Sequence, residues 1–181
     1  GYFGIVTSKL VGDNGIIISI EPQSRLTKII LKNKDANKIK NLFVEKLAIS
    51  DSNSIANLNL SSNINSGLSK LGTKKLSIYN SEYVKTKTLT YIFKKYRLSN
   101  VKVLKIDIEG YEYEAIFGSK DLFLNHFIEN IIIEIHQNLL IKKNKKKEDI
   151  IKFLENCGYK KSKELCIHNN ENNQILLFYK Y

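Results

Sequence analysis

The sequence predicts an α/β fold in which a doubly wound, mostly parallel sheet forms a single domain over residues 1–181. Short apolar runs of strand length alternate with segments whose apolar residues recur at helical spacing. A helix in each connection between successive strands places those strands parallel and covers both faces of the sheet. Acidic side chains follow several of the strands, at the edge where such sheets bind ligands.

In the first half of the chain, apolar periodicity switches repeatedly between helix and strand. The expected elements are a helix over residues 3–10, a strand over 16–20, a helix over 23–34, a strand over 41–49 and a short strand over 55–60. Pro22 falls in the first turn of the second helix, where its missing N–H costs nothing. Residues 61–80 are rich in Ser, Asn, Gly and Lys, and we expect a surface insertion that could cover a binding site.

The second half continues the alternation. The expected elements are an edge strand over residues 83–88, a helix over 89–98, a buried strand over 101–106, a helix from about Tyr111, a short helical segment over 121–127, a strand over 130–136, a helix over 148–158, and two strands near 159–167 and 174–181. No internal repeat interrupts this order, so one core is expected.

Composition places the chain among ordinary globular proteins, since 43% of its residues are hydrophobic and 26% are charged. No apolar run approaches the ~18–20 residues that span a bilayer, so we expect no membrane span. Cys157 and Cys166 lack metal-binding or redox spacing, which is typical of free thiols in a reducing compartment. We therefore expect a cytoplasmic protein; no pattern indicates its oligomeric state.

The net charge of +11, from 29 Lys and Arg against 18 Asp and Glu, raises the alternative of a basic, noncatalytic nucleic-acid-binding module. The lysines are nevertheless spread along the chain. The one dense run, IKKNKKKED at residues 141–149, is expected to be a solvated loop that leads into a helix. Nucleic acid is therefore not the expected partner.

The stretch VKVLKIDIEGYEYEAI, residues 101–116, runs from a strand into a group of acids. On a strand's period of two, Lys105 and the acid that follows the strand point the same way, and Gly110 allows a close turn into the next helix. The strand that ends at residue 136 should finish beside this one, at the same crevice. The candidate catalytic residues are Asp107, Glu109 and His136.

Glu21 is the strongest candidate for a cofactor contact. A carboxylate can accept both hydroxyl hydrogens of a ribose diol, and nucleotide-binding α/β folds place an acid about twenty residues after their glycine turn. Gly1 lies twenty residues before Glu21, which is the spacing expected if Gly1 ends such a turn. Asp51 follows the next expected strand and is a further candidate for the same crevice.

Six segments, in this order, resemble the FkbM-type methyltransferases, a branch of the class I S-adenosylmethionine-dependent enzymes. They are GYFGIV from Gly1, IEP at residues 20–22, LAISD at 47–51, KTLTYIF at 87–93, KIDIEGYE at 105–112 and IIIEIH at 131–136. Together they extend over nearly the whole chain. KIDIEGYE, close to the family's Lys-Ile-Asp-Val-Glu-Gly-x-Glu, is the most specific of them.

This resemblance implies a Rossmann-like, seven-stranded sheet, usually with an antiparallel last strand, and S-adenosyl-L-methionine as the cofactor. It implies methyl transfer to a hydroxyl oxygen of a sugar, glycan or secondary metabolite. By position, Gly1 belongs to the cofactor loop, Glu21 holds the ribose, Asp51 lies near the adenine, and Asp107 lies beside the methionine part or the acceptor. The family's first strand and most of its glycine motif have no counterpart here, so we expect an amino-terminally truncated domain that lacks that strand.

Methyl transfer to oxygen requires in-line alignment and a group that takes the acceptor's proton. We expect His136 to be that base, with an unperturbed pKa suited to neutral pH. No metal is expected, although Asp107, Glu134 and His136 leave a divalent-metal site open as an alternative. A nicotinamide-dependent oxidoreductase is a further alternative, because Glu21 also suits that cofactor's ribose, but KIDIEGYE has no counterpart there.

Overall fold

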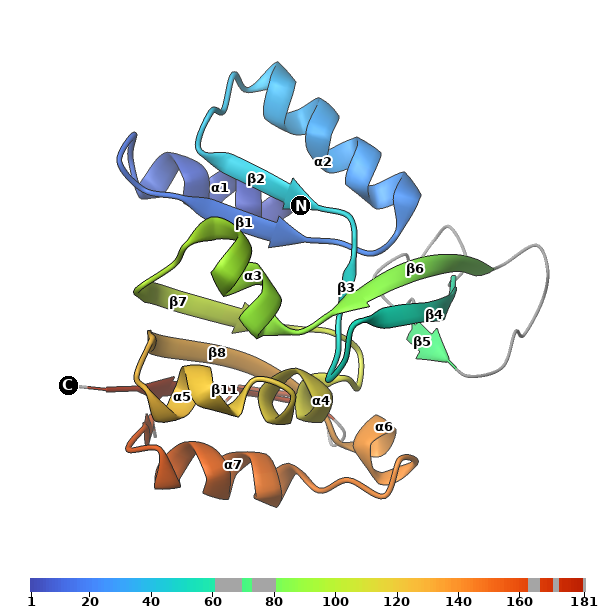
Figure 1. The fold of residues 1–181 in the computed structure, drawn as a ribbon, viewed down its shortest axis with the longest axis vertical. Helices are drawn as coiled ribbons and strands as arrows, with labels where there is room; N and C mark the ends of the chain where they lie inside the picture. The colour runs from blue at the N-terminus through green and yellow to red at the C-terminus, as the bar shows by residue number, and fades with distance from the viewer. Residues whose placement is uncertain (61–69, 73–80, 163–166, 171–172, 181) are drawn as a thin grey trace. The chain divides into compact units, whose positions relative to one another are not determined.

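The structure is a computed structural model that describes residues 1–60, 70–72, 81–162, 167–170 and 173–180. The chain forms two compact units. Unit 1 comprises Gly1–Ala48 and Ser54–Thr86, and unit 2 comprises Ile49–Asn53 and Lys87–Tyr181. Figure 1 colours their elements from blue to red along the chain. The mixed α/β class is as predicted. The described strands form several sheets, and one doubly wound parallel sheet in a single domain stays a prediction.

Unit 1 combines a parallel strand pair with an antiparallel ribbon. Its elements are α1 (Tyr2–Leu10), β1 (Ile17–Ile20), α2 (Ser24–Ala36), β2 (Leu42–Glu45), β4 (Ser54–Asn59), β5 (Lys70–Gly72) and most of β6 (Ser81–Lys87). β1 and β2 are parallel, and β4 pairs antiparallel with both β5 and β6. Two buried clusters stabilise the unit: Ile30, Ile39 and Leu42 form the first, and Ala48, Leu58 and Val84 form the second.

Three expectations for unit 1 need correction. The strand expected over residues 41–49 is divided into β2 and β3 (Ala48–Ile49), because the Leu47 N–H donates to the Glu45 carbonyl at 3.1 Å in a tight turn. β6 lies between β3 and β4, so it is not an edge strand. α2 begins at Ser24 with Gln23 as its N-cap, so Pro22 precedes the helix.

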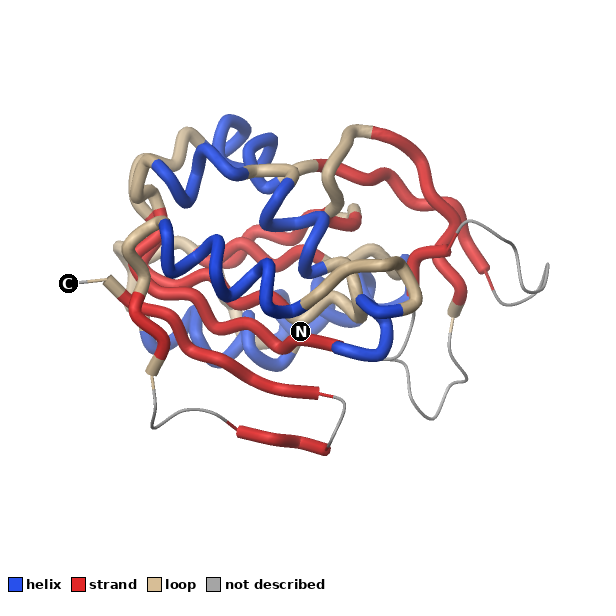
Figure 2. Tube along the Cα trace, turned by 90° about the horizontal axis from the view of Figure 1, so that it is seen from below, coloured by secondary structure: helices blue, strands red, loops and turns tan. Residues whose placement is uncertain are grey.

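Unit 2 is built on a sheet whose described strands follow the order β10-β11-β8-β7, with β9 also paired to β11. Its elements are α3 (Leu89–Tyr96), β7 (Val101–Ile106), α4 (Glu112–Phe117), α5 (Lys120–Leu124), β8 (Ile128–His136), α6 (Gln137–Ile141), α7 (Lys147–Asn156), β9 (Lys160–Lys161), β10 (Ile167–Asn170) and β11 (Asn173–Tyr179). β7 and β8 are parallel, while β11 is antiparallel to β8, which confirms the antiparallel last strand. Figure 2 shows β10 as the outermost strand.

β8 lies at the centre of the unit 2 core. Ile131, Ile133 and Ile135 have no exposed surface, because β8 has hydrogen-bonded neighbours on both sides and packs against α4. Strand β7 is less covered, since the Val103 side chain is 54% exposed. The prediction of a buried strand over residues 101–106 is therefore wrong for Val103, although Ile106, next to the candidate site, is buried.

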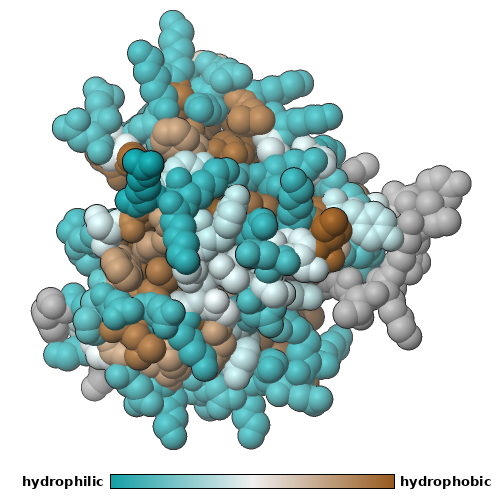
Figure 3. Space-filling view, viewed as in Figure 1, coloured by the Kyte–Doolittle hydropathy of each residue, from teal (hydrophilic) through white to brown (hydrophobic). Residues whose placement is uncertain are grey.

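The surface mixes hydrophilic residues with smaller hydrophobic patches on the face that Figure 3 shows. Among the described residues, no helix has the length and apolar character needed to cross a membrane. Cys157 is a buried free thiol, whereas Cys166 lies outside the described residues. The expected insertion over residues 61–80 also lies outside them, apart from β5, which extends the ribbon next to β4.

Candidate functional site

The turn after β7 depends on two residues with left-handed backbone conformation. Glu109 and Gly110 have φ angles of 51° and 92°, after which the chain enters α4 at Glu112. A Cβ atom added at Gly110 would lie 2.5 Å from the Cβ of Leu139, so the turn requires glycine there. The Glu-Gly pair therefore sets the direction in which the acids leave the strand.

Asp107 is the first residue after β7, and its side chain is exposed. The Lys105 ammonium donates to Asp107 Oδ2 at 2.9 Å, which confirms that the two side chains point the same way. Among the described residues, the second oxygen, Asp107 Oδ1, accepts no hydrogen bond. The residue is thus anchored on one side and open on the other.

Glu112 and His136 form a buried pair that joins the turn to the end of β8. Glu112 has no exposed surface, and its Oε1 accepts the Gly110 N–H at 2.8 Å. The same oxygen lies 2.9 Å from Nδ1 of His136. Because Oε1 is already an acceptor, Nδ1 carries the proton and donates it, which leaves Nε2 on the other side of the ring. Glu112 therefore holds the turn through a backbone N–H.

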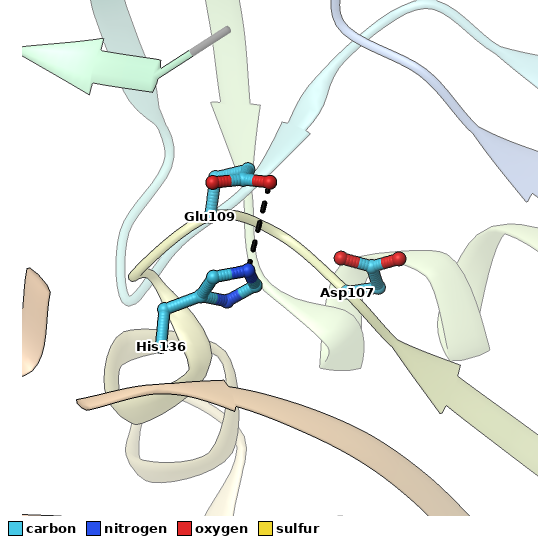
Figure 4. A group of neighbouring side chains, drawn as sticks. All are labelled: Asp107, Glu109 and His136. Atoms are coloured by element: carbon cyan, nitrogen blue, oxygen red, sulfur yellow. Dashed lines mark ion pairs between the residues drawn. The ribbon is translucent and has the colours of Figure 1, made fainter. Parts of the chain in front are cut away.

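Asp107, Glu109 and His136 are brought together, as the parallel register of β7 and β8 predicts. One nitrogen or oxygen atom from each lies within 4.8 Å of the others. Figure 4 shows the Glu109 carboxylate facing the His136 ring, with Asp107 beside them. The Nε2 atom of His136 is 3.5 Å from Glu109 Oε1 and 3.9 Å from Glu134 Oε1.

The charge around His136 overturns the expectation of an unperturbed imidazole. Burial acts to lower the pKa of His136, but the hydrogen bond to Glu112 and the negative charges of Glu112, Glu109 and Glu134 outweigh it. Together they raise the pKa of His136 above its ordinary value of 6.5. The imidazolium form of His136 therefore persists to higher pH than that of an ordinary histidine.

Lys143 is a site residue that sequence reasoning missed. Its ammonium lies 2.6 Å from Glu114 Oε1, donates to the Gly110 carbonyl at 2.8 Å, and lies 3.6 Å from the centroid of the Tyr111 ring. The run that contains it was expected to be a solvated loop, yet α6 begins directly after His136 and returns Lys143 to the turn. Within a lysine-rich run, no sequence pattern distinguishes the one lysine that contacts a turn, so Lys143 could not be predicted.

Asp51, the predicted adenine-side residue, lies in unit 2 and is exposed. A Cβ atom at Gly118 would come within 2.4 Å of the Asp51 Cα, so the backbone of Asp51 packs tightly against the end of α4. Burial, together with the charges of Glu114 and Asp51, raises the pKa of Tyr111. Asp51 and Tyr111 are therefore electrostatic neighbours within this unit.

Glu21 and Gly1, the other predicted cofactor residues, lie in unit 1. Glu21 Oε1 accepts the Gln23 N–H at 2.8 Å, and among the described residues Oε2 accepts no hydrogen bond. Burial raises the pKa of Glu21; the Gln23 N–H opposes that rise, and the negative charge of Glu82 adds to it. Gly1 is the N-cap of α1, and a Cβ atom there would lie 2.4 Å from Cγ1 of Ile30.

Comparison with known protein families gives a match that covers most of the chain. Residues 2–161 match the family described as the methyltransferase FkbM domain, which is most of the chain of 181 residues. No curated protein and no solved structure matches the chain. The match includes KIDIEGYE, the segment that supplies Asp107, Glu109 and Glu112. The chain therefore belongs to the FkbM methyltransferase family.

Proposed function

We propose that this methyltransferase transfers the methyl group of S-adenosyl-L-methionine to a hydroxyl oxygen of a sugar, glycan or secondary metabolite. The observation that carries the proposal is the convergence of Asp107, Glu109 and His136 at the carboxyl ends of two adjacent parallel strands. This is the edge at which α/β sheets bind ligands. The group combines acceptors for a hydroxyl hydrogen with an imidazole that can exchange a proton.

Glu21 is the proposed ribose contact. Its Oε1 is fixed by the Gln23 N–H, so the carboxylate is oriented before a ligand arrives, and Oε2 accepts no hydrogen bond in the described part of the chain. A carboxylate held in this way can accept hydrogen bonds from the ribose hydroxyls at little entropic cost. Gly1 is proposed for the cofactor loop, Asp51 for the adenine side, and Asp107 for the methionine part or the acceptor.

In the proposed mechanism, the sulfonium methyl is already activated when the cofactor binds. The protein aligns the acceptor oxygen with the methyl carbon and removes the acceptor's proton. His136 is the proposed base, because Glu112 holds Nδ1–H and leaves the Nε2 lone pair facing the carboxylates of Glu109 and Glu134. Since the pKa of His136 is raised, turnover through this base should increase as pH rises through that pKa.

The family match favours methyl transfer over the nicotinamide-dependent and nucleic-acid-binding alternatives. No observation on the described residues favours either of them specifically. The cytoplasmic location, based on the cysteines, stays a prediction.

Calorimetric titration with S-adenosylhomocysteine tests the cofactor assignment. The titration uses the full-length protein, its Glu21→Ala variant, and Asp13→Ala, which replaces an exposed acid in a turn of the same unit. We expect saturable binding by the wild-type protein. Glu21→Ala should weaken this binding by about tenfold or more, because it removes a charged hydrogen-bond acceptor. Asp13→Ala should leave the affinity unchanged. Absence of binding by a folded protein would reject the proposed cofactor.

A further inference from the structure

Several acidic side chains lie around His136. Four carboxylates surround the ring or its neighbours: Asp107, Glu109, Glu112 and Glu134. Asp107 is also paired with Lys105, at 2.9 Å. Glu109 and Glu134 are only 14% and 18% exposed, so solvent screens them weakly. Carboxylates grouped in this way attract a cation.

The buried imidazole is oriented as in metal-binding histidines. The His136 side chain is 6% exposed, and its Nδ1–H donates to the Glu112 carboxylate. A carboxylate on the far nitrogen fixes the tautomer and increases the basicity of the ligating nitrogen in many metal sites. In the described part of the chain Nε2 makes no hydrogen bond, and its nearest carboxylate oxygen is 3.5 Å away. The lone pair of Nε2 is thus directed at the acidic group.

We propose that Asp107, Glu109 and His136 bind a hard divalent cation, Mg²⁺ or Mn²⁺, through one carboxylate oxygen each and through Nε2. Their ligand atoms lie within 4.8 Å of one another, close enough for one ion to reach all three after small side-chain movements. The two carboxylates are the ligands that suit these ions. The open side of Asp107 leaves positions for water or an acceptor oxygen.

Glu109 replaces Glu134, which belonged to the alternative metal set predicted from the sequence. The positive φ of Glu109 turns its carboxylate back toward β8, a direction that spacing along a strand does not predict. Glu134 lies 3.9 Å from Nε2 and outside the converging group, although its charge still acts on the site. The proposed ligand set therefore depends on the convergence of atoms from Asp107, Glu109 and His136.

The role of the cation rests on the proposed function, whereas its binding does not. A cation at this point would bind the acceptor's hydroxyl oxygen and lower the pKa of that hydroxyl. The cation would also occupy the Nε2 lone pair that the proposed base uses. His136 therefore serves either as ligand or as base, and cation binding decides between the two.

The test is a titration of the metal-free full natural protein with MnCl₂, in which the electron paramagnetic resonance signal of free Mn²⁺ measures the bound fraction. Wild type is compared with Asp107→Asn, Glu109→Gln and the control Asp121→Asn, which replaces an exposed acid on α5. Asp107 is itself exposed, so its amide variant should fold. Circular dichroism checks each variant, and added MgCl₂ tests competition for the site.

We expect one Mn²⁺ per wild-type chain, affinity lowered about tenfold or more in both ligand variants, and no change in the control. Weak binding of equal strength in all four folded proteins would overturn the site, as would no binding by wild type. The S-adenosylhomocysteine titration is independent of this result. Cofactor binding without Mn²⁺ binding would reject the cation alone, and Mn²⁺ binding without cofactor binding would reject the cofactor alone.

Discussion

Nδ1 of His136 lies 2.9 Å from Oε1 of Glu112, a carboxylate with no exposed surface, and this contact joins the end of β8 to the turn after β7. The same oxygen accepts the Gly110 N–H, so one atom fixes both the turn and the imidazole. The other Glu112 oxygen is buried without a hydrogen-bond partner among the described residues. Glu112 is therefore a positioning residue for His136, whatever His136 binds.

Replacing Glu112 with Gln should lower the pKa of His136. Burial of the ring lowers that pKa, whereas the Glu112 carboxylate raises it through both its hydrogen bond and its charge. Once the carboxylate is replaced, the lowering effect of burial meets less opposition. Titration of the histidine ring resonances by nuclear magnetic resonance measures the shift. His126, which is exposed, provides the internal control, and an unchanged His136 would contradict the assigned contact.

Replacing Glu21 with Gln should stabilise the unliganded protein near neutral pH while weakening cofactor binding. Because burial raises the folded-state pKa of Glu21, the folded state binds more protons than the unfolded state between the ordinary value of 4.5 and the raised value. Stability is therefore lost as pH rises through that window, and Gln avoids the loss while it still accepts the Gln23 N–H.

Thermal unfolding of wild type and Glu21→Gln, measured on both sides of this window, checks the sign. The melting temperature of the variant should exceed that of wild type above the window, and the difference should disappear below 4.5. A less stable variant at neutral pH would show that the Glu21 charge is compensated by a contact that Gln cannot make.

Lys143→Met should destabilise the turn, because it leaves the Glu114 carboxylate, 12% exposed, without its cation at 2.6 Å and removes a donor from the Gly110 carbonyl. The expected cost is about 1–3 kcal/mol of unfolding free energy. Adding Glu114→Gln should recover part of it, since no buried charge then remains unpaired. Denaturant unfolding of both single variants and the double variant measures the coupling, expected at about 0.5–3 kcal/mol.

Gly110→Ala should cost more stability than Gly158→Ala. Both glycines have positive φ, 92° and 82°, so each substitution carries a backbone penalty of about 1–2 kcal/mol. A Cβ atom at Gly158 meets nothing within 4 Å, whereas one at Gly110 lies 2.5 Å from the Leu139 Cβ. Overpacking should add about 1–3 kcal/mol at Gly110 alone. Equal losses in chemical unfolding would contradict the close approach of Leu139.

Local patterns predicted most elements of the fold. The continuous apolar run before Glu21 became β1, and the run before Asp107 became β7, because both rest on short-range periodicity. The errors have identifiable causes. The turn at Leu47 divides a segment whose composition is uniformly strand-like, and the position of β6 inside its sheet depends on pairing with segments distant in the sequence. The helix α6 precedes the lysine-rich run, and no element was predicted over its residues.

Sequence patterns were enough to predict the family, through the order of its motifs, and to place Asp107 and His136 at the ends of neighbouring parallel strands. These predictions were possible because the period of a strand is a local property, and because the crossover rules depend only on the order of strands and helices along the chain. Tertiary structure alone decided the electrostatics: that Glu112 holds Nδ1, that Glu109 rather than Glu134 joins the converging group, and that Lys143 closes the turn. These outcomes depend on burial and on distances of a few ångströms between side chains, and no spacing along the chain encodes such distances.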